Sequence, residues 1–297
     1  MLYEKGAKMD HYIKKEMLLQ FKEKMIQDEK GSMTIQKYLR DVKAFCNFIG
    51  EERKVNKEIV VQYKNSLLQN YAPASINSML AALNRFFKEM GWYDCTVKAL
   101  KIQRVAFRDQ EKELSKKEYL RLVGAAEKSR NHRLSLLMQT ICATGIRVSE
   151  LRFITVDSLV EGCAVVSLKG KTRKVLLPSK LCCSLKKYAK KRGIKKGSIF
   201  VTKTGKPLDR SNILHDMKKL CEQAKVDRKK VFPHNLRHLF ACLYYQNVKD
   251  LSRLADLLGH SNVNTTRIYT CVSGQEQKRQ IEKLGLIWLN EENYSQE

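Results

Sequence analysis

Three separated segments in the second half of the chain carry polar residues whose types suit phosphoryl transfer. They contain Arg147 in ATGIRVSEL, His234 and Arg237 in HNLRH, and His260 and Tyr269 in LGHSNVNTTRIYT. Two arginines can bind nonbridging phosphate oxygens with bidentate forks. Histidines can donate hydrogen bonds or transfer protons near neutral pH. A tyrosine can attack phosphorus and hold the product covalently. Together these residue types favour DNA or RNA cleavage through a phosphotyrosine.

A fourth segment supplies lysines. Residues 163–178 alternate strand-forming residues around a basic centre, which predicts a β-hairpin with Gly170 and Lys171 in a two-residue turn. A lysine at this tip could protonate the leaving 5′ oxygen. The chain shows no carboxylate cluster typical of Mg²⁺ and no glycine-rich phosphate loop. We therefore expect no metal and no cofactor in the reaction.

Taken singly, each segment has an ordinary structural interpretation. Arg147 could cap a helix or form a salt bridge, and a basic hairpin tip is usually solvated. His234 and Arg237 could be surface residues, and Tyr269 could belong to the core. The catalytic interpretation depends on all four segments occurring in one chain.

The charge of the chain points to the same kind of partner. The 297 residues carry a net charge of +26, and such an excess favours binding to a polyanion through release of counterions at phosphates. No apolar stretch is long enough for a transmembrane helix, and the first residues lack a signal-peptide pattern. We expect nucleic acid as the partner, no membrane, and a cytoplasmic location.

Nine cysteines raise the question of disulfides or zinc. Cys46, Cys142 and Cys242 lie inside apolar stretches, where a thiol acts as a small buried hydrophobe. Cys182 and Cys183 are adjacent, which suits neither a redox pair nor a zinc site. We interpret the cysteines as structural thiols.

Hydrophobic periodicity predicts the elements that carry these segments. The first hundred residues show four short amphipathic helices, over 12–27, over 33–49, after a cap at Asn56, and from Pro73 or Ser75 to Gly91. Four such helices with short loops form a small bundle.

The second half begins after a basic, aperiodic stretch over residues 98–112, which we interpret as a linker. Ser115 and Glu118 form a capping box that opens a new helix. Further elements are predicted as an apolar helix over 134–143, the hairpin, a third short strand over 198–202, helices from Asn212 onward, and a helix over 251–258 that ends at Gly259. The expected fold class is mainly α with a small antiparallel β-sheet in the second of two domains (α+β).

The motifs ATGIRVSEL, KGKTRKVLLP, HNLRH and LGHSNVNTTRIYT resemble, in order and spacing, those of the tyrosine recombinase family of phage integrases and Xer-type enzymes. The resemblance implies a helical core-binding (SAM-like) DNA-binding domain over residues 9–97 and a basic linker over 98–112. It implies a catalytic domain with a C-terminal oligomerisation tail over 113–297. The two domains would close as a clamp on duplex DNA.

The resemblance also implies residue roles. Glu150 would support the site, and Lys169 would be the general acid. Lys171 is the alternative if the hairpin register shifts by two residues. The remaining catalytic residues implied by the family are Arg147, His234, Arg237, His260 and Tyr269.

The implied activity is site-specific recombination of double-stranded DNA through a 3′-phosphotyrosine and a Holliday junction. Integration, excision, inversion and dimer resolution all remain open. The family implies a monomer in solution and a homotetramer on DNA, associated with the nucleoid when active. An apolar tail would dock on a neighbouring protomer, with packing within the same chain as the alternative; its residues are Ile281, Leu284, Leu286, Ile287 and Trp288. The chain begins close to its first predicted helix, which favours an Xer-like or small mobile-element enzyme. The alternatives are a type IB topoisomerase and a non-enzymatic DNA-binding regulator.

Overall fold

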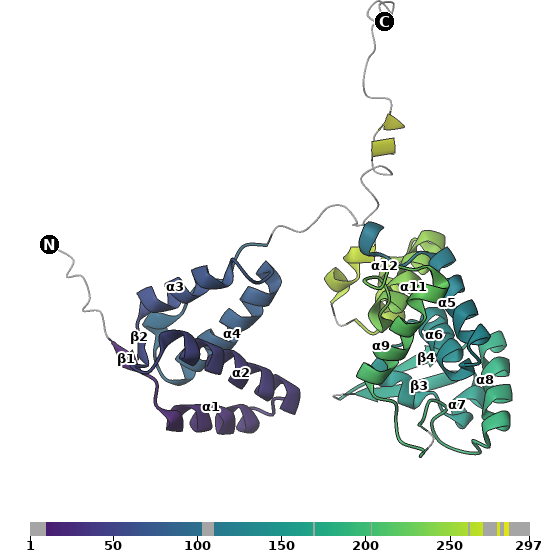
Figure 1. The fold of residues 1–297 in the computed structure, drawn as a ribbon, viewed down its shortest axis with the longest axis horizontal. Coiled ribbons are helices and arrows are strands. Elements are labelled where there is room, and N and C mark those ends of the chain that lie inside the picture. Colours follow the sequence, from purple (N-terminus) through teal and green to yellow (C-terminus); the bar gives the residue numbers. More distant parts are fainter. Residues whose placement is uncertain are drawn as a thin grey trace, which may run out of the picture. The chain divides into compact units, whose positions relative to one another are not determined.

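The computed structural model describes residues 10–102, 110–168, 170–202, 204–260, 262–269, 278–279 and 282–284. The chain divides into two compact units, Met1–Arg104 and Val105–Glu297. Figure 1 shows helices α1 to α4 in the first unit and the hairpin β3–β4 among helices in the second. Among the described residues, no helix is long and apolar enough to cross a membrane.

The first unit is the predicted four-helix bundle. Its helices are α1 (Lys15–Gln27), α2 (Ser32–Ile49), α3 (Lys57–Leu67) and α4 (Pro73–Glu89), followed by the short turn η1 (Tyr93–Cys95). Two short strands, β1 (His11–Tyr12) and β2 (Lys54–Val55), pair antiparallel. The Asn56 side chain accepts a hydrogen bond from the Ile59 N–H at 3.1 Å, which confirms the predicted cap of α3.

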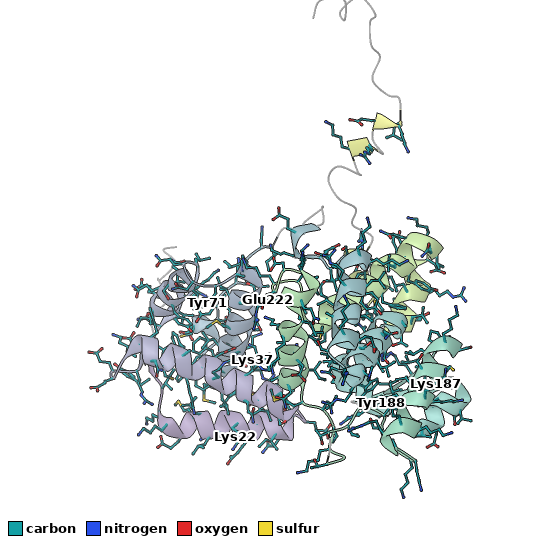
Figure 2. All side chains as sticks on the ribbon, turned by 45° about the vertical axis from the view of Figure 1, so that its right-hand side comes forward. Lys22, Lys37, Tyr71, Lys187, Tyr188 and Glu222 are labelled. Carbon is teal, nitrogen blue, oxygen red and sulfur yellow. The ribbon has the colours of Figure 1, made fainter. Side chains whose placement is uncertain are left out.

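Aromatic residues fill the centre of the first unit. Phe21, Phe45, Phe86 and Phe87 are fully buried, and the rings of Phe21 and Phe86 meet edge to face with centroids 5.4 Å apart. Such contacts add to the stabilisation from apolar burial. Most charged residues lie outside, as Lys22 on α1 illustrates (Figure 2), whereas Asp41 on α2 is buried and pairs with Lys37 and Arg40. The bundle therefore has its own core and a basic exterior.

The second unit is mainly helical. Its α-helices and strands are α5 (Lys116–Lys128), α6 (His132–Thr144), α7 (Val156–Glu161), β3 (Cys163–Leu168), β4 (Lys171–Leu176), α8 (Ser179–Arg192), α9 (Arg210–Lys219), α10 (Cys221–Ala224), α11 (Pro233–Val248) and α12 (Leu251–Leu258). Short 3₁₀ turns are η2 (Gln110–Lys112), η3 (Val148–Phe153), η4 (Val263–Thr265) and η5 (Arg267–Tyr269). The capping box of Ser115 and Glu118 is present, with both reciprocal hydrogen bonds. The mainly α fold class with a small antiparallel sheet is confirmed.

The hairpin differs from the sequence prediction in its turn. Leu168 pairs with Lys171, so Lys171 is the first residue of β4, and Gly170 lies in the turn with a φ of +73°. The turn therefore lies one residue earlier than predicted, because the positive φ suits glycine at the second turn position. Lys169, the other turn residue, lies outside the described residues.

The predicted third strand over 198–202 is wrong. Within the described residues, this segment forms only two isolated bridges, Thr155 with Ser198 and Val201 with Pro207. The buried Ile199 and Phe200 anchor it to the core of the second unit instead. The segment thus packs through these two side chains and, within the described residues, does not pair with the hairpin.

Candidate active site

Two helix ends that terminate in glycine form the framework of the site. Gly145 ends α6 and Gly259 ends α12, both in the left-handed region with φ of +65° and +63°. A Cβ on Gly145 would lie 2.5 Å from the Phe240 ring of α11, and one on Gly259 would collide with the Arg173 side chain. Glycine is required at both positions, and the last carbonyls of both helices face the same buried arginine.

Arg237 is that arginine. It lies on α11 and is only 2% exposed. Its guanidinium donates to the Gly145 carbonyl, to the Leu258 carbonyl at 2.7 Å and to His260 Nε2 at 3.1 Å. Carbonyls at helix C-termini lack partners within the helix and carry negative partial charge, so they stabilise a buried cation. Burial lowers the pKa of Arg237 to about 10, which leaves it charged at neutral pH.

Glu150 holds two further arginines. Its carboxylate is buried and accepts from Arg147 Nη1 at 3.0 Å, from the Arg147 backbone N–H at 2.9 Å and from Arg173 Nη2 at 2.9 Å. Arg147 precedes η3, whereas Arg173 projects from β4. Glu150 therefore joins η3 to the hairpin, and the half-exposed Arg147 side chain keeps donors available to a ligand.

His260 is neutral in this environment. Burial lowers the pKa of His260 to about 4, and the charges of Arg237, Arg147 and Arg173 act in the same direction. Its Nε2 faces the donor-only guanidinium of Arg237, so Nε2 accepts. Its Nδ1 then carries the proton and donates to Thr266 Oγ1 at 2.8 Å. The buried Thr266 thus selects the tautomer of His260.

Tyr269 lies in η5 and is 2% exposed. Its ring stacks on His260 with centroids 6.4 Å apart and meets the edge of His238 at 5.0 Å. Burial raises the pKa of Tyr269, while the charge of Arg237 and a hydrogen bond with it act in the opposite direction. The hydroxyl therefore lies next to the buried arginine and is protonated at neutral pH.

The remaining predicted residues have less defined surroundings. His234 follows Pro233 in the first turn of α11 and is exposed. Desolvation lowers the pKa of His234, and the charges of Arg237 and Arg147 lower it further. Lys169 and the side chain of Lys171 lie outside what the structure describes. The choice between the two lysines stays a prediction.

The structure therefore gathers most of the predicted residues around Arg237. Direct contacts link Arg237 to His260 and Tyr269, and Arg147 reaches the Gly259 carbonyl at 3.4 Å. Sequence patterns did not single out Arg173, Thr266 or His238 as parts of this site. For Arg173 a signal existed, because it follows the hairpin tip at an inward position of β4, opposite the buried Val166.

Comparisons with known proteins identify the family of the chain. Residues 112–276 match the phage integrase family, and residues 18–92 match the phage integrase N-terminal SAM-like domain. The tyrosine recombinase XerA of Thermococcus kodakarensis is 28% identical over 280 residues, covering 92% of this chain and 96% of the relative. The tyrosine recombinase XerD of Halalkalibacterium halodurans is 30% identical, covering 81% and 87%.

Solved structures show the same fold. A crystal structure of XerA recombinase is 26% identical with a TM-score of 0.50, covering 92% of this chain and 99% of that one. A lambda integrase tetramer bound to a Holliday junction has a TM-score of 0.69 at 19% identity, covering 86% and 76%. With a family match over more than half of its length, the chain belongs to the phage integrase family of tyrosine recombinases.

Proposed function

We propose that this recombinase cuts and rejoins double-stranded DNA at a specific site, with Tyr269 as nucleophile. The observation that carries the proposal is the contact of Tyr269 with Arg237 and His260 beside the Arg147–Glu150 pair. The phenol oxygen attacks the scissile phosphorus, and the bond to the 5′ oxygen breaks. The product is a 3′-phosphotyrosine, and rejoining reverses these steps. Because the bond energy is conserved, neither ATP nor a metal is needed.

The charged residues take roles that follow from their surroundings. Arg147 and Arg237 bind the nonbridging oxygens and stabilise the charge that develops in the transition state. Three N–H groups of Arg237 are taken by carbonyls and His260, which leaves two of its five donors for Tyr269 and the phosphate. Glu150 fixes Arg147.

Proton transfer completes the reaction. His234 and His260 have lowered pKa values and are neutral at physiological pH. His234 can therefore accept the Tyr269 proton or donate a hydrogen bond, whereas His260 can accept that proton only after its Nε2 leaves Arg237. We assign the proton that goes to the leaving 5′ oxygen to Lys169, with Lys171 as the alternative.

The larger assembly is part of the same proposal. The lambda integrase structure is a tetramer on a Holliday junction. We propose that this chain likewise acts as a homotetramer on DNA and exchanges strands in two steps. Residues 9–97 and 113–297 would close around the duplex, joined by the basic linker 98–112. The reaction would take place in the cytoplasm, on the nucleoid. Of the apolar residues of the proposed docking tail, only Leu284 lies among the described residues, and it is exposed.

A nicked duplex tests the proposed chemistry. A pool of duplexes from the DNA flanking the gene is nicked so that the short 5′-hydroxyl fragment is lost after cleavage and the adduct is trapped. The native chain should form a covalent adduct, and Tyr269→Phe should bind the same DNA without forming it. Tyr245→Phe is the matched control, because Tyr245 packs against the same hydrophobic cluster. An adduct that persists with Tyr269→Phe would contradict the assignment.

A further inference from the structure

A cluster of three potential metal ligands lies directly beside Tyr269, outside the proposed catalytic set. His238 and Cys242 are one helical turn apart on α11, and Glu113 precedes α5. The Cys242 Sγ lies 3.3 Å from His238 Nδ1, and the Glu113 carboxylate lies 3.7 Å from His238 Nε2. The proposed reaction gives none of the three a role.

The backbone holds these residues together. The Asn235 side-chain amide donates to the Lys112 carbonyl at 3.1 Å and to the Lys230 carbonyl at 2.7 Å. Asn235 is itself buried on α11, so it ties the segment before Glu113 to the helix that carries the other two residues. The cluster is thus built by packing and does not depend on a chance meeting of surface side chains.

The ligand types suit zinc. Zn²⁺ binds cysteine sulfur, histidine nitrogen and carboxylate oxygen, usually in a tetrahedron, and sites with three protein ligands keep a fourth position open. One ligand atom from each residue lies within 4.8 Å of the others. Metal–ligand bonds of about 2.0–2.3 Å place ligand atoms about 3.3–3.7 Å apart, so the cluster must contract by at most about 1–1.5 Å.

Side-chain movement can supply that contraction. His238 now directs one nitrogen to Cys242 and the other to Glu113, so its ring must turn to offer one nitrogen to a shared ion. The Glu113 and His238 side chains are 26% and 17% exposed, which leaves them room to move and gives an ion a path from solvent. A thiolate and a carboxylate also neutralise the two charges of zinc beside Arg237.

The position of the cluster gives it a consequence for Tyr269. The His238 ring meets the Tyr269 ring edge to face at 5.0 Å, and Cys242 belongs to the same buried cluster as Tyr269. A phenolate oxygen is a suitable fourth ligand for an ion held there. We propose that Glu113, His238 and Cys242 form an inhibitory zinc site that captures the Tyr269 oxygen and withdraws it from DNA. Binding releases the thiol and phenol protons to solvent and involves no redox change.

Cobalt spectroscopy tests the site without any assay of recombination. Co²⁺ substitutes for Zn²⁺ in tetrahedral sites and shows thiolate charge transfer and visible d–d bands. The reduced native chain should show both, and zinc should displace them. Cys242→Ser and Glu113→Gln should weaken Co²⁺ binding by about tenfold or more. Cys221→Ser is the matched control, because Cys221 is a cysteine of the same unit, 6% exposed like Cys242.

The inhibitory part rests on the proposed function and is measured separately. Zinc should slow adduct formation on nicked DNA by the native chain and by Cys221→Ser, while Cys242→Ser should keep its metal-free rate when zinc is added. Cys242→Ala serves as a second variant if the serine disturbs folding. Absence of thiolate bands, or bands that survive Cys242→Ser, would overturn the site. Bands without inhibition of an active chain would overturn the capture of Tyr269, and a chain that forms no adduct without zinc would refute the proposed function instead.

Discussion

Removal of the Glu150 carboxylate should destabilise the second unit strongly, because it is the counter-charge of a largely buried arginine. Glu150 is 2% exposed and faces Arg147 and Arg173. The Arg147 side chain is 40% exposed and can turn to water, but the Arg173 side chain is only 16% exposed. Burial and the charge of Arg147 already lower the pKa of Arg173, and Glu150 alone opposes them. The Glu150→Ala variant therefore leaves a buried cation without its counter-charge.

The size of the effect follows from that loss. Breaking a buried ion pair by removing one partner costs about 3–5 kcal/mol, so we expect Glu150→Ala to lower the free energy of unfolding by this amount. Glu150→Gln keeps an oxygen that can accept one hydrogen bond, and its cost should be about 1–3 kcal/mol. Since the penalty comes from the unpaired charge of Arg173, the double variant with Arg173→Ala should recover part of it, with a coupling energy of about 0.5–3 kcal/mol.

Urea unfolding of the full chain, followed by circular dichroism, measures these differences. The four chains of the double-mutant cycle are compared at 25 °C and neutral pH through the transition of the second unit. Glu150→Ala should also slow adduct formation, because Arg147 loses its support. A cost below about 1 kcal/mol for Glu150→Ala, or strictly additive effects in the double variant, would refute the argument that the buried charge pair is coupled.

Two further changes follow from the same geometry, and a third tests the general-acid assignment. Burial lowers the pKa of His260 from 6.5 to about 4, so between these pH values the unfolded chain binds more protons than the folded chain. The free energy of unfolding should therefore fall by at most about 3 kcal/mol as the pH falls from 6.5 to about 4. This pH dependence should be weaker in His260→Gln. Gly259→Ala combines an unfavourable positive φ with a collision against the Arg173 side chain, whereas Gly162→Ala has the same unfavourable φ but open space around the new Cβ. In urea unfolding, Gly259→Ala should therefore lose more free energy of unfolding than Gly162→Ala, by about 1 kcal/mol or more. Lys169→Ala should regain cleavage on a 5′-phosphorothiolate substrate, whose leaving group needs no acid, while rescue of Lys171→Ala alone would reverse the assignment.

The sequence predicted the helices well, because caps and helix ends depend on residues close to one another in the chain. The Asn56 cap, the box of Ser115 and Glu118 and the stop at Gly259 all depend on residues within one turn of each other. Periodicity likewise placed the four helices of the first unit to within a few residues. Such features need no knowledge of the tertiary structure.

The sequence could not show how distant segments meet. The partners of Arg237 are carbonyls at the ends of α6 and α12, and backbone carbonyls leave no mark in the sequence. In the sequence, Arg173 resembles the other basic residues of the hairpin. Its place in the site depends on its ion pair with Glu150, which lies 23 positions earlier. The short run 198–202 had strand-like residues, but its pairing depended on a neighbour that the fold does not provide.

The burial of Tyr269 is the feature least visible in the sequence. A nucleophile is expected to be accessible, yet Tyr269 is 2% exposed between two histidines. Its position depends on η4 and η5, where Thr266 binds His260 and packs inside. In the proposed reaction, DNA must therefore draw Tyr269 out of this pocket before cleavage, which makes the accessibility of the phenol a point of control.

The identity of the residue that carries the DNA is the most direct test of the account. The trapped adduct is digested with protease and nuclease, and the modified peptide is sequenced by tandem mass spectrometry. We expect a nucleotide 3′-phosphate attached to the phenol oxygen of Tyr269, with no such mass in Tyr269→Phe. A nucleotide on any other residue, or attachment through a 5′-phosphate, would contradict the proposed mechanism.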